Sequence, residues 1–222
     1  MKNILLIFLL IITYLLNAQT EAYQVISESE AKIQQQKDSI ELQSLIDSAN
    51  LGNSDKQLIL GQLYRSGQRP DGSNIQVAQE IGILEYYSNS FVTDYKKALY
   101  WLLKSAKNNN TLAQNDLGLM YDYGEGVPEK GDSAFYWYSI AAKKCLAEAQ
   151  NNIARLYFLG KGVAMNYIKS YAWAGLAVDN GSTMAEKGIQ MLKEALNDTE
   201  IEEAEKLKEN LKKRLICDDN NL

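Results

Sequence analysis

Two consecutive stretches of the chain, residues 113–142 and 149–178, align with each other at an interval of 36 residues without a gap. The paired positions carry similar residues in the same order: Ala113 with Ala149, Leu117 with Ile153, Gly118 with Ala154, Tyr121 with Tyr157, Gly124 with Gly160, Gly126 with Gly162, Ala134 with Ser170 and Trp137 with Trp173. A period of this length is typical of a solenoid, because one helix pair cannot bury its apolar face alone and must stack on a copy of itself. The repeat therefore predicts an all-α solenoid of antiparallel helix pairs.

Each unit begins with an amphipathic helix, which we name helix A. Its small or apolar positions fall three and four residues apart, as Ala113, Leu117 and Tyr121 do, which is the spacing of one helix face. At Gly118 the missing side chain would let a neighbouring helix approach closely. A turn of two glycines then ends helix A, because glycine enters left-handed conformations without steric cost. A second helix, helix B, follows, with tryptophan as its large core residue.

This run of residues resembles the Sel-one-like repeat, a relative of the tetratricopeptide repeat. The resemblance covers roughly residues 55–196 and is most specific over residues 113–185. It implies a right-handed α-solenoid that mediates protein interactions, often as an adaptor in larger complexes, and it implies no catalytic residue. The third unit departs from the pattern at Ala154, Ser170 and Gly175, where the helix packing can differ.

An earlier unit is present in a less regular form. Its repeat positions are Leu60, Gly61, Tyr64 and Gly67 in helix A, and Ala98 and Trp101 in helix B. Leu60 precedes Leu117 by 57 residues, 21 more than the repeat, so we expect an insertion over about residues 68–94. Insertions in repeat arrays emerge on one face, often the binding face. Its aromatic residues are expected mainly to pack the insertion on to the solenoid, with ligand contact as the alternative.

The N-terminal residues predict export. Lys2 is followed by the apolar run Ile4–Leu16, and Ala18 offers a small residue for cleavage, so residues 1–18 are interpreted as a signal peptide. An uncleaved anchor is the alternative. The mature protein would be periplasmic or secreted, without stable membrane insertion.

The rest of the chain divides into three parts. Residues 19–37 are expected to form a polar linker or frayed helix, residues 38–196 the solenoid, and residues 197–222 a C-terminal capping helix and tail. The solenoid would begin with a capping B helix over Ile40–Asn50. The C-terminal helix would begin with a capping box in which Asn197 and Glu200 satisfy backbone amides.

The composition argues against most kinds of catalytic and metal site and against nucleic-acid binding. The chain contains no histidine, which removes the commonest general base and most catalytic zinc sites. We therefore expect no catalytic residue, metal or cofactor. With 23 basic and 28 acidic residues, the formal charge of −5 disfavours binding to nucleic acid. Two alternatives stay open: a secreted enzyme that acts on cell-envelope polymers through carboxylates, and a secreted effector that acts on host proteins.

The two cysteines lie 72 residues apart, at Cys145 and Cys217. If the last helix continues the stack, they are separated by about two units, and a disulfide requires α-carbons within about 7 Å. We therefore expect two separate thiols, with a disulfide between them or an intermolecular link as the alternatives. Cys145 also aligns with Gly52, Asn109 and Gly181 at a position where a left-handed residue stops each B helix.

A partner is expected on the A helices, whose non-core positions face the inner side of a stacked solenoid. Such a surface could hold a protein or peptide partner of unknown identity. Ordinary solvated or half-buried residues are the alternative interpretation. The predicted binding residues are Gln62, Arg65, Asn115, Leu119, Asp122, Asn151, Arg155 and Phe158.

Overall fold

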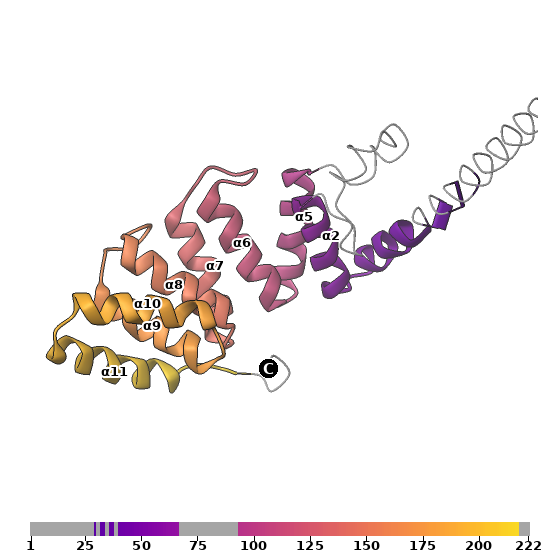
Figure 1. The fold of residues 1–222 in the computed structure, drawn as a ribbon. Coiled ribbons are helices and arrows are strands. Elements are labelled where there is room, and N and C mark those ends of the chain that lie inside the picture. Colours follow the sequence, from indigo (N-terminus) through magenta and orange to yellow (C-terminus); the bar gives the residue numbers. More distant parts are fainter. Residues whose placement is uncertain (1–28, 30–31, 34–35, 38–39, 67–92, 218–222) are drawn as a thin grey trace, which may run out of the picture. The chain divides into compact units, whose positions relative to one another are not determined.

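The computed structural model describes residues 29, 32–33, 36–37, 40–66 and 93–217. The chain divides into two compact units, residues 1–47 and 48–222, and the second contains the helices labelled in Figure 1. These are α2 (Ser54–Ser66), α5 (Tyr95–Lys107), α6 (Thr111–Tyr123), α7 (Gly131–Lys143), α8 (Ala147–Leu159), α9 (Tyr167–Asp179), α10 (Thr183–Ala195) and α11 (Asp198–Lys212). The predicted signal peptide, Gly67 and nearly all of the predicted insertion lie outside the described residues.

The helices form three A/B pairs, α2 with α5, α6 with α7 and α8 with α9, which confirms the predicted α-solenoid. In the first two pairs a glycine of helix A faces a large residue of helix B. A Cβ on Gly61 would lie 2.5 Å from Leu102 Cγ, and one on Gly118 would lie 2.4 Å from the Tyr138 ring. In the third pair the corresponding positions are Ala154 and Ala174, both buried in one cluster. The glycines are therefore required by close helix packing, and the third pair replaces a glycine and a bulky residue with two alanines.

The tryptophans occupy equivalent places between units. Trp137 packs against the core cluster of α2, α5 and α6, and Trp173 packs against the next cluster, whose buried residues belong to α7 and α8. Val127 and Val163 accompany them in the same two places. The residue that fills the middle of the second pair is Tyr138, which is fully buried and was not among the predicted core positions.

The turns also follow the prediction. Gly124 and Gly160 end α6 and α8 in the left-handed conformation, with φ of 71° and 67°. The stops after the B helices are likewise left-handed at Asn109 and Cys145, with φ of 67° and 66°. Cysteine is uncommon at positive φ, which favours glycine and asparagine.

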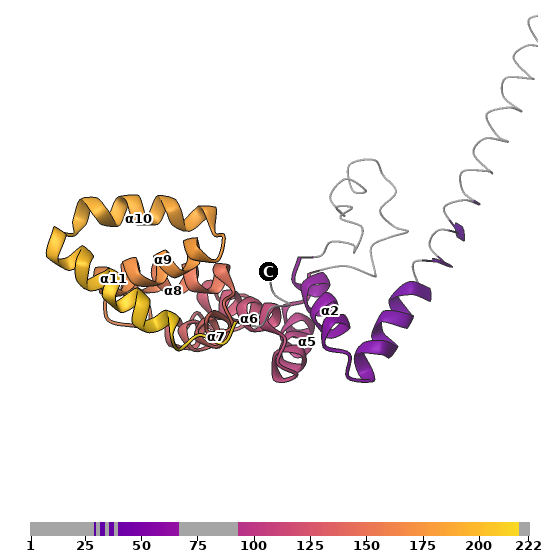
Figure 2. The same ribbon diagram turned by 90° about the horizontal axis from the view of Figure 1, so that it is seen from below.

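The C-terminal cap differs from a further repeat unit. Helices α10 and α11 both pack against α9 (Figures 1 and 2). Gly175 of α9 makes room for this arrangement, since a Cβ there would lie 2.7 Å from Lys208 Cδ of α11. The predicted capping box is present at the start of α11, where Asn197 and Glu200 bond each other's backbone amides.

The path of α11 corrects the expectation of separate thiols. Cys145 and Cys217 form a disulfide with a Cα–Cα distance of 5.1 Å. The expectation was wrong because α11 returns along α9 and does not extend the stack, so the following segment reaches the end of α7. There the Ile216 amide donates to the Lys143 carbonyl at 2.7 Å.

Candidate functional site

The predicted binding residues lie on α2, α6 and α8, and several of them tie neighbouring A helices together. Between α2 and α6, the Gln62 amide donates to Asp116 at 2.8 Å. Arg65 pairs with Glu125 at 2.5 Å and with Asp116 at 3.6 Å. Burial raises the pKa of Asp116, although Gln62 and Arg65 act in the opposite direction. The two predicted residues of α2 are therefore held by the next unit.

Asn115 and Asn151 occupy equivalent positions in α6 and α8. Asn115 is only 8% exposed, and its side-chain oxygen accepts a hydrogen bond from Asn152 at 3.2 Å. Asn151 is half-buried. Asn115 therefore serves mainly as a link between α6 and α8, and its neighbour Asn152, which was not predicted, completes that link.

Asp122 is fully buried, so the expectation that it faces a partner on the inner side of the A helices was wrong. Its carboxylate accepts a hydrogen bond from the Tyr138 hydroxyl at 3.1 Å and pairs with Lys161 at 2.8 Å and with Arg155. Burial alone would raise the pKa of Asp122, but the hydrogen bonds and charges of Lys161 and Arg155 outweigh burial and lower it. Burial and the charge of Asp122 raise the pKa of Tyr138. Asp122 is thus an ionised structural centre that a partner cannot contact directly.

The same two repeat positions form a charge pair at successive junctions. The first position, near the end of helix A, is Arg65 in the first unit and Asp122 in the second. The second position, between the two turn glycines of the next unit, is Glu125 and then Lys161. The signs are therefore exchanged between junctions while the geometry is kept. This pairing was not predicted, although the sequence carries opposite charges at the two aligned positions.

The two apolar candidates are also partly engaged inside the protein. Leu119 is half-buried against the cluster that contains Tyr138 and Ile153. Phe158 stacks on Tyr167, with ring centroids 5.3 Å apart, and packs against the C-terminal cluster. This arrangement agrees with the alternative interpretation that these two residues are half-buried packing residues.

A tyrosine that was not predicted stands at the junction of α6 and α8. Tyr123, the last residue of α6, is 60% exposed. The Arg155 guanidinium lies 5.8 Å and the Lys161 ammonium 6.0 Å from the centroid of its ring. Leu159, at the equivalent position of the next unit, is 55% exposed. We name Tyr123, Arg155, Leu159 and Lys161 the junction patch. It presents an aromatic ring, an aliphatic side chain and two cations that share the buried acid Asp122. Lys161 also pairs with the exposed Glu129 at 2.8 Å.

The described part of the chain holds no group of three or more acidic or cysteine side chains arranged for a metal ion. Among the same residues, no helix has the length and apolar character needed to cross a membrane.

The repeats match those of a known family. The Sel1 repeat family matches residues 80–110, 111–144 and 147–182. The chain carries three Sel1 repeats. The first matched range, residues 80–110, begins inside the segment that we interpreted as an insertion. Its helix B is α5, which in the structure packs against α2. Repeats of this family generally mediate protein interactions, and proteins built from them are typically scaffolds without enzymatic activity.

Solved structures show the same fold. A Sel1 repeat protein from Oxalobacter formigenes is 27% identical, with a TM-score of 0.51 over 68% of this chain and 97% of that protein. The second is c5321, a protective antigen of uropathogenic Escherichia coli strains with an SLR fold. It is 25% identical, with a TM-score of 0.55 over 78% of this chain, which spans 41% of that protein. The chain matches no curated protein.

Proposed function

We propose that the protein is an exported, non-enzymatic interaction module that binds a protein or peptide partner at the junction patch. The observation that carries this proposal is the exposed Tyr123 ring, beside which lie the Arg155 guanidinium and the Lys161 ammonium. Tyrosine and arginine are among the residues that most often dominate binding energy at protein interfaces. The hydrogen bonds and ion pairs between neighbouring units hold both sides of the patch, so its side chains lose little conformational entropy when a partner binds.

Two features support the exported location. The first is the predicted signal peptide over residues 1–18. The second is the disulfide between Cys145 and Cys217, since disulfides persist mainly in oxidising compartments. Cell fractionation and N-terminal sequencing of the natural protein test this part of the proposal. We expect a mature protein that begins near Gln19, outside the cytoplasm.

The binding surface can be tested with two tyrosines of nearly equal exposure. Tyr123 belongs to the junction patch and is 60% exposed, whereas Tyr136 lies on helix α7 and is 59% exposed. The Tyr123→Ala and Tyr136→Ala variants would be used to recover partners from the native cell after mild crosslinking. We expect Tyr136→Ala to retain the partner of the wild type and Tyr123→Ala to lose it. Equal recovery with both variants would show that the junction patch is not the binding surface.

A further inference from the structure

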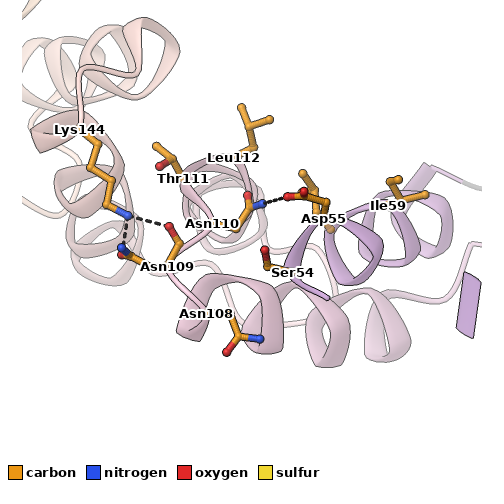
Figure 3. Close-up of a pocket in the computed structure, with 10 residues that line it drawn as sticks. Ser54, Asp55, Ile59, Asn108, Asn109, Asn110, Thr111, Leu112 and Lys144 are labelled. Carbon is orange, nitrogen blue, oxygen red and sulfur yellow. Dashed lines mark hydrogen bonds between the residues drawn. The ribbon is translucent and has the colours of Figure 1, made fainter. Parts of the chain in front are cut away.

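A cavity beside the first turns of α2 and α6 has its charged groups engaged within the chain. The Asp55 carboxylate accepts a hydrogen bond from the Asn110 amide at 3.0 Å (Figure 3). The Lys144 ammonium donates to the backbone and side-chain oxygens of Asn109. Both contacts join the first unit to the second. The charged side chains of this cavity therefore hold the solenoid together.

Helix α10 exposes apolar side chains near the C-terminal end of the solenoid. One face of α10 packs on the core through Ala185, Ile189 and Leu192, with α9 beside it (Figure 2). Next to this buried face, Met184 is 73% and Met191 is 59% exposed. The last unit of a repeat array normally has a polar outer face, because no further unit covers it. Exposed methionines are instead common at binding surfaces.

These methionines belong to a stripe with the spacing of a coiled-coil seam. Apart from its chain neighbours and the backbone of its own helix, Gly188 has nothing in the described chain within 4 Å of the place of a Cβ. Intervals of four, three and four residues keep such positions on one side of a helix. Large and small residues alternate along the stripe, which we name the α10 seam and which consists of Met184, Gly188, Met191 and Ala195.

A second copy of α10 in the antiparallel direction complements this seam in size. Met191 then faces Gly188 of the second copy, and Met184 faces its Ala195. The seam is spaced symmetrically about its midpoint, so a large side chain meets a small one at each of its levels. A parallel copy would place methionine against methionine and glycine against glycine, and the gaps at glycine would lose packing contacts.

The charges along one edge of the seam also fit an antiparallel copy. Lys187 directly precedes Gly188, and Glu194 directly precedes Ala195, so both charges lie on the same edge. Both side chains are exposed, and neither forms an ion pair within the described part of the chain. In an antiparallel pair Lys187 faces Glu194 of the second copy, and the reverse contact forms on the other side of the axis. Charges that flank a seam set the orientation of paired helices.

We propose that the α10 seam joins two copies of this chain in an antiparallel pair with twofold symmetry. Such an interface uses one surface twice, so each favourable contact occurs on both sides of the axis. A seam on one helix buries less than the about 1,200 Å² of a standard interface. The pair is therefore weak, with a Kd on the order of tens of micromolar. No residue of the junction patch belongs to the seam, so the two surfaces can be tested separately.

Sedimentation equilibrium of the mature protein over about 5–500 µM, a range that brackets this affinity, measures the pairing. We expect a reversible equilibrium between monomer and dimer. Met191→Glu would place a carboxylate in the apolar seam and should weaken dimerisation at least tenfold. The matched control is Met165→Glu, in the turn between α8 and α9, because Met165 is 61% exposed. This control should dimerise within twofold of the wild type, as should Tyr123→Ala in the junction patch.

Exchange of the flanking charges tests the antiparallel direction. Lys187→Glu and Glu194→Lys each set like charges against each other on both sides of the axis, so each should weaken dimerisation at least fivefold. An equimolar mixture of these two variants restores both ion pairs and should dimerise within threefold of the wild type. The two positions lie seven residues apart on one helix, so this recovery cannot arise within a monomer. Circular dichroism shows whether each variant is folded.

Three results would overturn the proposal. The first is a wild type that stays monomeric up to about 500 µM, which would leave the seam to a different protein. The second is a folded Met191→Glu variant that dimerises as strongly as the Met165→Glu control. The third is a mixture of the two charge variants that dimerises no better than either variant alone. None of these results concerns the junction patch, so the proposed partner-binding surface stands or falls by its own test.

Discussion

Removing the disulfide should strongly destabilise the C-terminal half of the solenoid. The bond closes a loop of 72 residues that contains the third helix pair and the cap. Without the bond the unfolded chain gains conformational entropy, which for a loop of this length lowers the free energy of unfolding by about 4 kcal/mol. The other contacts of this tail in the folded protein compensate little for the missing bond, because Ile216 and Cys217 are exposed and a backbone hydrogen bond joins Ile216 to α7.

The substitution must not disturb the backbone at Cys145, whose φ is 66°. Asparagine accepts this conformation and occupies the equivalent stop after α5, at Asn109. The variant to study is therefore Cys145→Asn combined with Cys217→Ser. With an m value of about 2 kcal/mol per M, its urea midpoint should fall by about 2 M. Adding a reductant should lower the wild-type midpoint by a similar amount and leave the variant unchanged.

A midpoint shift below about 0.5 M, with the same m value, would contradict this prediction. The prediction would also be refuted if a reductant lowered the midpoint of the variant as much as that of the wild type. The single variant Cys217→Ser is the control, because it opens the bond without any change at the left-handed position.

Two further predictions concern helix packing and pH. Gly118→Ala would place a Cβ against the Tyr138 ring and should lower the free energy of unfolding by about 1–3 kcal/mol. Gly188 in α10 has open space around it, so Gly188→Ala should raise the free energy of unfolding by about 1 kcal/mol. Thermal unfolding measures both variants, and equal effects on stability would contradict the close packing at Gly118. Asp122 has a lowered pKa in the folded state, so its contribution to stability is present above the unfolded pKa and is lost as the pH falls through the folded value. Asp122→Asn should therefore weaken the dependence of unfolding on acidic pH, and the raised pKa of Asp116 predicts the opposite change of slope for Asp116→Asn. Urea unfolding between about pH 3 and 6, around the usual carboxyl pKa, tests these signs.

The sequence was sufficient to predict the helix pairs and the way they stack. The interval of 36 residues places Trp137 and Trp173 in equivalent positions, and the structure packs each against the preceding cluster. Gly118 was correctly interpreted as a site of close helix approach. These features follow from periodicity because every unit repeats the same packing problem.

The candidate site was less predictable, because a repeat position does not specify what its neighbour carries. Asp122 shares a helix position with Arg65 and Phe158, yet it is buried because Tyr138, Arg155 and Lys161 surround it. Tyr123 was overlooked since it ends its helix and stands outside the core pattern.

The disulfide was mispredicted for a different reason. The apolar face of α11 fits either a further repeat unit or a return along α9, and helical periodicity does not distinguish the two. Gly175 was the available signal, because a glycine inside a B helix makes room for Lys208 of the returning helix.

The most direct test of the central claim, that a partner binds the junction patch, is photo-crosslinking in the native cell. A photoreactive amino acid would replace Tyr123 in one strain and Tyr136, on α7, in another. Because the two positions have equal exposure within a few per cent, chance contacts should label both equally. We expect one specific crosslinked partner at position 123 and none at position 136. The same partner at both positions, or at position 136 alone, would contradict it.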